Sequence, residues 1–431
     1  MKMKKVMALC MAVAMGVPAF ATTWYVSPAG AKSNEGTTPD APLKTIYGAL
    51  DKAAPGDRIN VAAGVYGGKA GVGHIEITKA VELYGGYSAD FKTRDYKKNQ
   101  SIIRPKMEQN ATPPKNGTVE FTLTDDKGKT VFDGFFIDHS EVNAYHPKEG
   151  QPEGVSTGYW LEPPTKGNYP FASLKKYAIY GNTTGDFTIT NCLILNSSFY
   201  AININHLRGV VNIKNNLIIN SRMMACNVSC RSAKAFDTRL NFEYNTVLFT
   251  WSRTKDFGDM GYGVRALSKV DANISHNIIG LSIMSAFDNS QNNRPGEQKV
   301  TLNENMFFLN KKGDVSYTVS PSVKYLKVDD EAFEDFEDVQ GIESCVKNVS
   351  LSNPAAFKGM LDDKFLAGFL SASYTESTDY NPNSPANQFR SAMGMNQVGS
   401  IQSKVSMYAN KYPYSDNLMK LFGAVKGYGA Q

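Results

Sequence analysis

A column of polar side chains can be aligned through the middle of the chain. Five short segments with apolar residues at alternate positions align at 177–181, 200–204, 224–228, 262–266 and 285–289. If these segments form neighbouring parallel strands, which lie ~4.8 Å apart, equivalent side chains stand in ladders on each face of the sheet. The outer ladder then reads Tyr180, Asn203, Asn227, Arg265 and Asp288. A guanidinium beside a carboxylate could supply acid–base chemistry, and the tyrosine and amides could bind a polar substrate.

The same alignment predicts a groove suited to a saccharide. The inward residues are Ile179, Ile202, Cys226, Val264 and Phe287, and a second outer column of small residues would form the floor: Ala178, Ala201, Ala225, Gly263 and Ala286. Two long segments, 141–175 and 251–259, precede these strands and could carry side chains over the same face. With Tyr180, Asn203 and Asn227, the predicted substrate-binding residues are therefore Trp160, Trp251, Arg253 and Lys255. The plainer alternative is that small and amide residues are simply tolerated on an exposed surface.

The catalytic interpretation of this face assigns the chemistry to Arg265 and Asp288. Elimination on a uronic-acid polysaccharide needs an Arg or Lys base and a positive group that neutralises the substrate carboxylate, and Arg265 is the only cation in the aligned column. Asp237, Asp256, Asp259 and Asp288 could offer oxygen ligands to Ca²⁺, but they form no recognisable cluster, so no cofactor is certain. Paired aspartates for hydrolysis do not fall in the outer columns.

Two hypotheses from different classes follow from these residues. In the first, the protein binds or cleaves an extracellular polysaccharide, and uronic-acid polymers are among the candidates. If it is an enzyme, its activity is lyase-like. In the second, it is a non-catalytic cell-surface or envelope protein with a structural or adhesive role. The first predicts that the polar column and the loop aromatics converge on one cleft, and the second predicts that they scatter.

An internal repeat explains how such a column is positioned. Asparagine is concentrated between Asn182 and Asn310, which hold 20 of the 35 in the chain. Five segments align there without gaps, at 187–196, 211–220, 240–249, 272–281 and 300–309, and an earlier segment, 131–138, fits with Gly134 at the turn. The turn position of the five holds Cys192, Asn216, Asn245, Asn277 and Asn305. Asn and Gly best tolerate the left-handed or bridging conformation that a corner between two short strands requires.

The spacing of this repeat favours a β-solenoid. Short strands that recur every 24 to 32 residues without a helical pattern are typical of stacked coils, in which one asparagine per coil can bond along the stack. A β-sandwich of short strands is the competing fold, but it has no reason to keep asparagine in register at five corners.

The N-terminal region adds a resemblance to a known family. Residues 24–67 read as a strand, a Gly/Asn/Pro loop, an amphipathic helix and a second strand, and the helix has an apolar face made of Ile46, Ala49, Leu50 and Ala53. This segment resembles the opening of secreted right-handed parallel β-helix proteins, the pectin-lyase-like superfamily. Residues 81–95 (VELYGGYSADFKTRD) resemble a surface-protein subset of that group. The resemblance spans roughly residues 24–310, and it implies a right-handed coil, a helix that plugs the N-terminal end, and substrates bound along a parallel sheet.

We therefore predict an all-β fold, a right-handed single-stranded parallel β-helix with helical caps at both ends. Residues 1–21 are expected to be a signal peptide, 22–310 the β-helix with an insertion at 141–175, and 311–431 an irregular extension that completes and caps it. The C-terminal cap would be a helix at 415–425, where a serine N-cap precedes apolar spacing.

Export is predicted from the first residues of the chain. A basic start, an apolar run at 6–17 and the sequence Ala19-Phe20-Ala21 form a signal peptide with its cleavage site, so the protein would be secreted, periplasmic or at the cell surface. No later segment is long and apolar enough for an integral membrane span, and a net charge of +5 over 431 residues argues against a nucleic-acid partner. Composition sets no oligomeric state.

Cysteine usage leaves two alternatives open. Cys192 and Cys226 fall at buried repeat positions, where they would act as small apolar residues. A disulfide between Cys226 and Cys230 is the alternative in an oxidising compartment.

Overall fold

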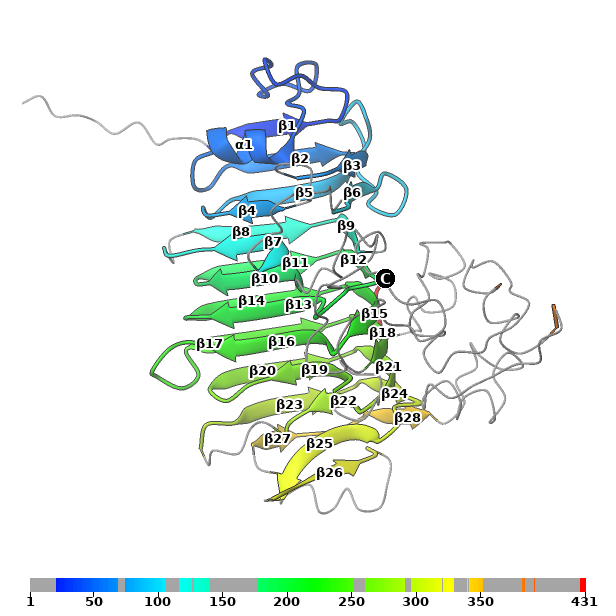
Figure 1. Ribbon diagram of the computed structural model, residues 1–431. Coiled ribbons are helices and arrows are strands. Elements are labelled where there is room, and N and C mark those ends of the chain that lie inside the picture. The colour runs from blue at the N-terminus through cyan, green and yellow to red at the C-terminus, as the bar shows by residue number, and fades with distance from the viewer. Residues whose placement is uncertain are drawn as a thin grey trace, which may run out of the picture.

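Three long β-sheets form a column with the N-terminal strands at one end (Figure 1). The computed structural model describes residues 21–68, 74–105, 116–125, 128–139, 177–251, 260–290, 296–319, 321–328, 339, 341–351, 382–383, 391 and 427–431. Sheet 1 contains, in order, β1 (Thr23–Val26), β2 (Arg58–Ala62), β5 (Glu82–Tyr87), β8 (Lys129–Asp133), β11 (Asp186–Thr190), β14 (Gly209–Lys214), β17 (Thr238–Glu243), β20 (Val270–Ser275), β23 (Lys299–Asn303) and β27 (Ile342–Ser344).

The other two sheets have the same stacking order. Sheet 2 contains β3 (Gly64–Tyr66), β6 (Ser101–Ile103), β9 (Phe135–Asp138), β12 (Leu193–Leu195), β15 (Leu217–Arg222), β18 (Thr246–Trp251), β21 (Ile278–Ser282), β24 (Met306–Phe308) and β28 (Val349–Leu351). Sheet 3 contains β4 (Ile75–Ile77), β7 (Gly117–Thr122), β10 (Tyr177–Thr183), β13 (Ile202–His206), β16 (Met224–Cys230), β19 (Tyr262–Ala266), β22 (Ser285–Asp288), β25 (Gly313–Val319) and β26 (Ser322–Leu326).

From β2 to β25, each coil contributes one strand to each sheet, which makes the fold a right-handed parallel β-helix, as predicted. The chain passes, for example, from β11 in sheet 1 to β12 in sheet 2 and then to β13 in sheet 3, before it returns to sheet 1 as β14. Strands of successive coils pair in parallel, and the final hairpin of sheet 3, β25 with β26, is antiparallel. Parallel strands joined by crossovers are almost always right-handed.

The interior is filled by alternate residues of the strands. The apolar positions that the repeat predicts as inward in sheets 1 and 3 are at most 1% exposed: Phe187, Ile189, Val211, Ile213, Leu240, Phe242, Ala272, Ile274, Val300, Leu302, Ile179, Ile202, Cys226, Val264 and Phe287. A strand that is buried on one face and polar on the other needs this alternation. The period-two pattern of the sequence is thereby confirmed.

The corner between sheets 1 and 2 lies one residue earlier than the sequence alignment places it. The left-handed residue precedes each stacked asparagine, with φ of 56° at Asn215, 54° at Tyr244 and 59° at His276. Even a tyrosine therefore takes this conformation, which costs free energy for a residue with a Cβ. The asparagine that follows is what the corner needs, because its buried amide bonds the corners together.

Stacked amides form a ladder inside this corner. The Oδ1 of Asn245 accepts both the main-chain N–H (3.0 Å) and the side-chain Nδ2 (2.9 Å) of Asn216, one coil earlier. Asn277 bonds Asn245 in the same way, and Asn305 bonds Asn277. The ladder continues to Asn348, which the sequence analysis did not include, so the register extends beyond residue 310.

A short helix, α1 (Ile46–Lys52), lies at the N-terminal end of the column (Figure 1). The expected apolar face is present, since Ile46, Ala49, Leu50 and Ala53 are buried in the core cluster. Thr45 precedes the helix, and its side chain accepts the N–H of Gly48 at 3.2 Å, which satisfies one free donor of the first turn. The helix predicted at 415–425 lies outside the described residues. In the described ranges, no helix has the length and hydropathy of a membrane span.

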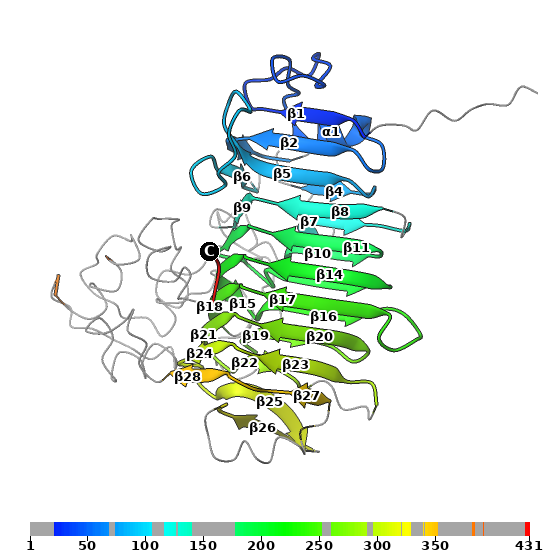
Figure 2. The same ribbon diagram turned by 180° about the vertical axis from the view of Figure 1, so that it is seen from behind.

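The end of the chain lies across the corners of several coils. The main-chain N–H of Gly429 donates to the carbonyl of His276 (2.8 Å), and that of Ala430 donates to Thr246 Oγ1 (2.9 Å). Both views place this segment, residues 427–431, beside β15 and β18 (Figures 1 and 2). The C-terminal segment therefore joins coils that are far from it in sequence.

The Tyr-Gly-Gly motif at the N-terminal end has a structural role. Gly86 has a φ of 88°, and a Cβ there would lie 2.7 Å from the Cα of Tyr96. Arg94 Nε donates to the carbonyl of Gly85 at 2.8 Å, and the guanidiniums of Arg58 and Arg94 lie 4.2 and 5.2 Å from the ring centroid of Tyr84. The motif is part of β5 in sheet 1, and these contacts fix its conformation against the segment at 94–96.

Candidate functional site

The predicted polar column runs along the outer face of sheet 3. The strand register makes Tyr180, Asn203, Asn227, Arg265 and Asp288 neighbours in that order, one per coil. The column is longer than the sequence alignment: Glu76 and Glu120 precede it, and Ser316 follows it. The sequence therefore predicted the middle of the column and missed both of its ends.

Polar side chains occupy the centre of this face in two rows. The inner row is Asn203 and Asn227 of the polar column, and the outer row is Asn182, Asn205 and Ser229, two residues further along the same strands. In the inner row, Asn227 Nδ2 donates to Asn203 Oδ1 at 2.7 Å, and each residue is 7% exposed. In the outer row, Asn205 Nδ2 donates to Asn182 Oδ1 at 3.4 Å, and Ser229 donates to Asn205 Oδ1 at 2.7 Å. The outer row is half-buried and thus the more accessible of the two.

Arg265 and Asp288 form an ion pair within the protein. Arg265 Nε donates to Asp288 Oδ2 at 2.5 Å, and Arg265 Nη2 contacts the same oxygen. The other oxygen of Asp288 accepts the Ser290 N–H (2.9 Å), Ser290 Oγ (2.5 Å) and Ser316 Oγ (2.7 Å). Because the aspartate is fully buried and both of its oxygens are bonded, the pair has the geometry of a structural ion pair.

The ring of Tyr262 packs against the guanidinium of this ion pair. The guanidinium of Arg265 lies 5.4 Å from the ring centroid of Tyr262. Burial raises the pKa of the Tyr262 hydroxyl, and the nearby charge of Asp288 raises it further. The hydroxyl of Tyr262 therefore stays protonated and can donate a hydrogen bond.

Four aromatic rings gather beside the amide rows. Tyr177 stacks on Tyr180 with centroids 5.3 Å apart, and it meets the edge of Tyr200 at 5.4 Å and Phe199 at 5.0 Å. Asn205 Nδ2 donates to the hydroxyl of Tyr180 at 3.2 Å, which connects the rings to the outer amide row. Burial raises the pKa of Tyr177 to about 12, so its hydroxyl is neutral at physiological pH.

Two glutamates at the start of the column were missed by the sequence analysis. Glu76 of β4 and Glu120 of β7 are register partners on adjacent coils. Glu76 is exposed, whereas Glu120 is 7% exposed and bonds the side chain of Asn116 at 2.7 Å. A signal for them exists, because Ile-Glu-Ile at 75–77 and Val-Glu-Phe at 119–121 are matching triplets. Neither triplet was aligned because the asparagine repeat begins only after them.

The expected floor of small residues is wrong. Ala178, Ala201, Ala225 and Ala286 are fully buried members of the core cluster. A Cβ on Gly263 would lie 2.7 Å from Ile279 Cγ2 of sheet 2. These residues are small because the corner between sheets 2 and 3 brings them against the core.

Several predicted site residues lie outside the described part of the chain. Trp160, Arg253 and Lys255 are among them, as is the side chain of Trp251, whose backbone ends β18. That the segments 141–175 and 251–259 reach the outer face of sheet 3 therefore stays a prediction. Among the described residues, no group of three His, Cys, Asp or Glu side chains could hold a metal ion.

The two closely spaced cysteines are not bonded to each other. Cys226 and Cys230 are free thiols on the same side of β16. Four residues of extended strand separate their Cα atoms by roughly 13 Å, which is too far for a disulfide. Cys192 and Cys226 are fully buried, as the repeat predicted.

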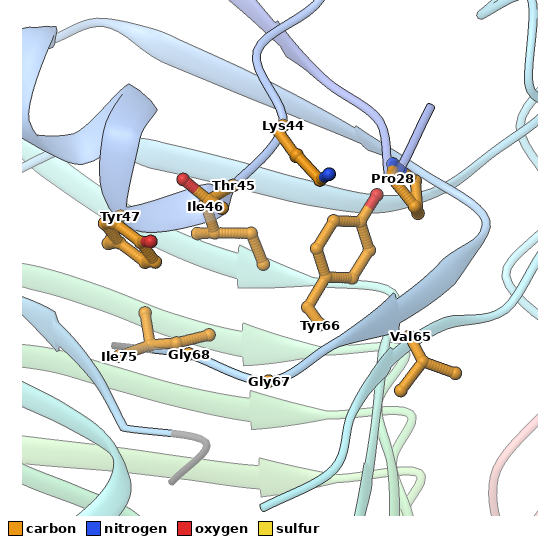
Figure 3. Close-up of a pocket in the computed structure, with 10 residues that line it drawn as sticks. All are labelled: Pro28, Lys44, Thr45, Ile46, Tyr47, Val65, Tyr66, Gly67, Gly68 and Ile75. Atoms are coloured by element: carbon orange, nitrogen blue, oxygen red, sulfur yellow. The ribbon is translucent and has the colours of Figure 1, made fainter. Parts of the chain in front are cut away.

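A separate pocket of about 220 Å³ lies beside α1 at the N-terminal end (Figure 3). Lys44, Thr45 and Tyr47 line it on one side, and Tyr66 and Ile75 line it on the other. The hydroxyl of Tyr66 already donates to the carbonyl of Ala62 at 2.8 Å, and Thr45 caps the helix. Tyr66 and Thr45 therefore stabilise the N-terminal end of the fold.

Comparison with known proteins gives distant likenesses in structure. No protein-family model matches the chain, and no curated protein matches it. A complex of XylC with xylose is similar at 12% identity, with 68% of this chain and 63% of that chain covered and a TM-score of 0.34. The GH136 lacto-N-biosidase from Eubacterium ramulus, as its selenomethionine derivative, has 12% identity, 77% and 67% coverage and a TM-score of 0.37.

A third solved structure, a rhamnogalacturonan lyase, is similar over more of the chain. It has 10% identity, 95% and 100% coverage and a TM-score of 0.37. The chain spans less than two thirds of the XylC structure. Because all three superpositions are poor, the parallel fold rests on the sheet topology described above.

Proposed function

We propose that this protein is exported and binds an extracellular polysaccharide along the outer face of sheet 3. The observation that carries the proposal is the half-buried outer row, Asn182, Asn205 and Ser229, which runs beside the tyrosine cluster with one residue per coil. Amides both donate and accept hydrogen bonds, as sugar hydroxyls do, and tyrosine offers an apolar ring with a polar tip. The coil spacing of ~4.8 Å repeats these groups along a line, which suits an extended polymer. The signal peptide predicted at 1–21 supports export.

Hydrolysis at the start of the column is a second candidate function. Glu76 and Glu120 stand on adjacent strands, which in a parallel sheet are ~4.8 Å apart, and two carboxylates flanking a glycosidic bond are the usual machinery for its hydrolysis. The lyase-like alternative with Arg265 as base requires the ion pair with Asp288 to open and the guanidinium to lose a proton, which arginine resists. Hydrolysis by the two glutamates is the simpler of the two reactions, because it requires neither a broken ion pair nor a deprotonated arginine.

A panel of extracellular polysaccharides tests the proposal. Retarded migration in gels that contain the ligand measures binding, and incubation with the same panel measures new reducing ends or new unsaturated ends. Binding to at least one polysaccharide supports the proposal, and new reducing ends lost in both Glu76→Gln and Glu120→Gln would assign hydrolysis to the pair. Unsaturated ends that vanish in Arg265→Lys would instead favour elimination. A protein that binds no glycan would leave the non-catalytic structural role as the better account.

A further inference from the structure

The outer face of sheet 3 carries little positive charge in the described part of the chain. Its centre consists of six neutral polar side chains on three adjacent coils, which are Tyr180, Asn182, Asn203, Asn205, Asn227 and Ser229. Recognition of a uronic-acid polymer needs a positive group near each carboxylate, since a carboxylate that loses its water without a partner is costly. The central rows offer hydrogen bonds without charge.

Two cations in the described part of the chain, Arg265 and Arg231, lie close to these rows. Arg265 is paired with Asp288, and the side chain of Asp288 is fully buried. Arg231, at the corner where sheet 3 ends, donates through Nε to the carbonyl of Asn205 (2.9 Å) and through Nη2 to the carbonyl of Thr183 (3.3 Å). Its guanidinium is exposed and keeps its charge, but these two bonds hold it at the rim of the face, away from the central rows.

The start of the column adds negative charge. Glu76 and Glu120 follow one another on adjacent coils, directly before Tyr180. A polyuronate lying along the column would bring its carboxylates next to these two side chains, and like charges at that spacing repel. A neutral chain meets no such penalty.

From this charge pattern we infer that the face takes an uncharged glycan, a neutral polysaccharide, rather than a polyuronate. The inference rests on the proposed function, because it names the substrate class of the same face. It sets this protein apart from the uronic-acid chemistry that the column suggested in the sequence. The fit is between sugar hydroxyls and the amide rows, with the tyrosine rings beside them.

Matched pairs of polymers test the charge preference directly. A galactan and a β-glucan are compared before and after oxidation of C6 to carboxylate, and polygalacturonate before and after methyl esterification. The expected result is binding to at least one uncharged form, with the carboxylated form of the same backbone bound at least about tenfold more weakly. Binding to the uncharged form should change little between low and physiological salt.

The possible results separate the two proposals. Equal or tighter binding of the carboxylated form, or binding that falls steeply with salt, overturns the inference and leaves glycan binding standing. Binding to none of the six polymers overturns glycan binding, and the inference with it.

An added cation gives an independent check on the same face. Asn182→Lys places a positive charge on the half-buried outer row, and it should raise affinity for polygalacturonate severalfold. Asn212→Lys makes the same change on the outer face of sheet 1, where Asn212 pairs with Asn241, and it should not raise that affinity. An equal effect of both variants would mean that net charge rather than this face governs binding, which contradicts the inference.

Discussion

Replacing one asparagine of the ladder at the corner between sheets 1 and 2 should destabilise the whole β-helix. In Asn245→Ala, the main-chain N–H and the side-chain Nδ2 of Asn216 lose their acceptor, and the carbonyl of Ile213 loses a donor at 2.8 Å. Asn245 is fully buried, so water cannot replace these partners. Each stranded group costs roughly 1 to 3 kcal/mol, and the expected loss in the free energy of unfolding is about 3 to 5 kcal/mol.

A second asparagine supplies the matched control for this prediction. Asn241 lies four residues away on the outer face of sheet 1, is half-buried, and donates one bond of 2.9 Å to Asn212. Asn241→Ala should cost roughly 0.5 kcal/mol or less. Urea unfolding of both variants, with the slope m unchanged, measures the difference. Losses of similar size in the two variants would refute the reasoning that the buried ladder, rather than asparagine in general, holds the coils.

Three further predictions concern buried charges, imidazoles and thiols. Asp288→Ala strands the Arg265 guanidinium and should cost roughly 3 to 5 kcal/mol in urea unfolding, more than replacing both residues by leucine does; equal losses would contradict a structural ion pair. Burial lowers the pKa of His139 to about 4, from about 6.5 in the unfolded chain. The contribution of the neutral imidazole to the free energy of unfolding is therefore complete above pH 6.5 and falls as the pH drops towards 4. His206 has a similarly lowered pKa, so His139→Gln should reduce, without abolishing, the dependence of the urea midpoint on pH over that range, and an unchanged dependence would count against it. Burial raises the pKa of the Cys226 thiol, so a thiol reagent should label half-buried Cys230 first and Cys226 only on unfolding; simultaneous labelling would disprove this order.

The repeat could be predicted from the sequence because its cause is local. Buried amides at Asn216, Asn245 and Asn277 must recur in register, and each is flanked by alternating apolar residues. The left-handed residue could not be located in the same way, because Tyr244 and Glu304 take that conformation against their own preference. The tertiary stack imposes it, and no local signal marks those residues. Asn348 was missed because a step of 43 residues breaks the period.

On the face that carries the candidate site, the sequence predicted which residues are neighbours but not which of them are exposed. Register follows from the repeat, so the alignment found Asn203 and Asn227 as neighbours. Exposure depends on what packs at the corners, and the alternation rule cannot show that Ala201 lies inside the core. The alignment also placed Arg265 beside Asp288, but it could not show that Asp288 is fully buried and that the two side chains close into an ion pair.

Glycan affinity of two single variants tests the central claim most directly. Tyr180 lies in the aromatic cluster and accepts a hydrogen bond from Asn205, whereas Asn241 lies on the outer face of sheet 1. On a polysaccharide that the protein binds, we expect Tyr180→Ala to weaken binding at least about tenfold and Asn241→Ala to leave it unchanged. Unchanged binding by Tyr180→Ala, or an equal loss in both variants, would contradict the assignment of the binding face to sheet 3.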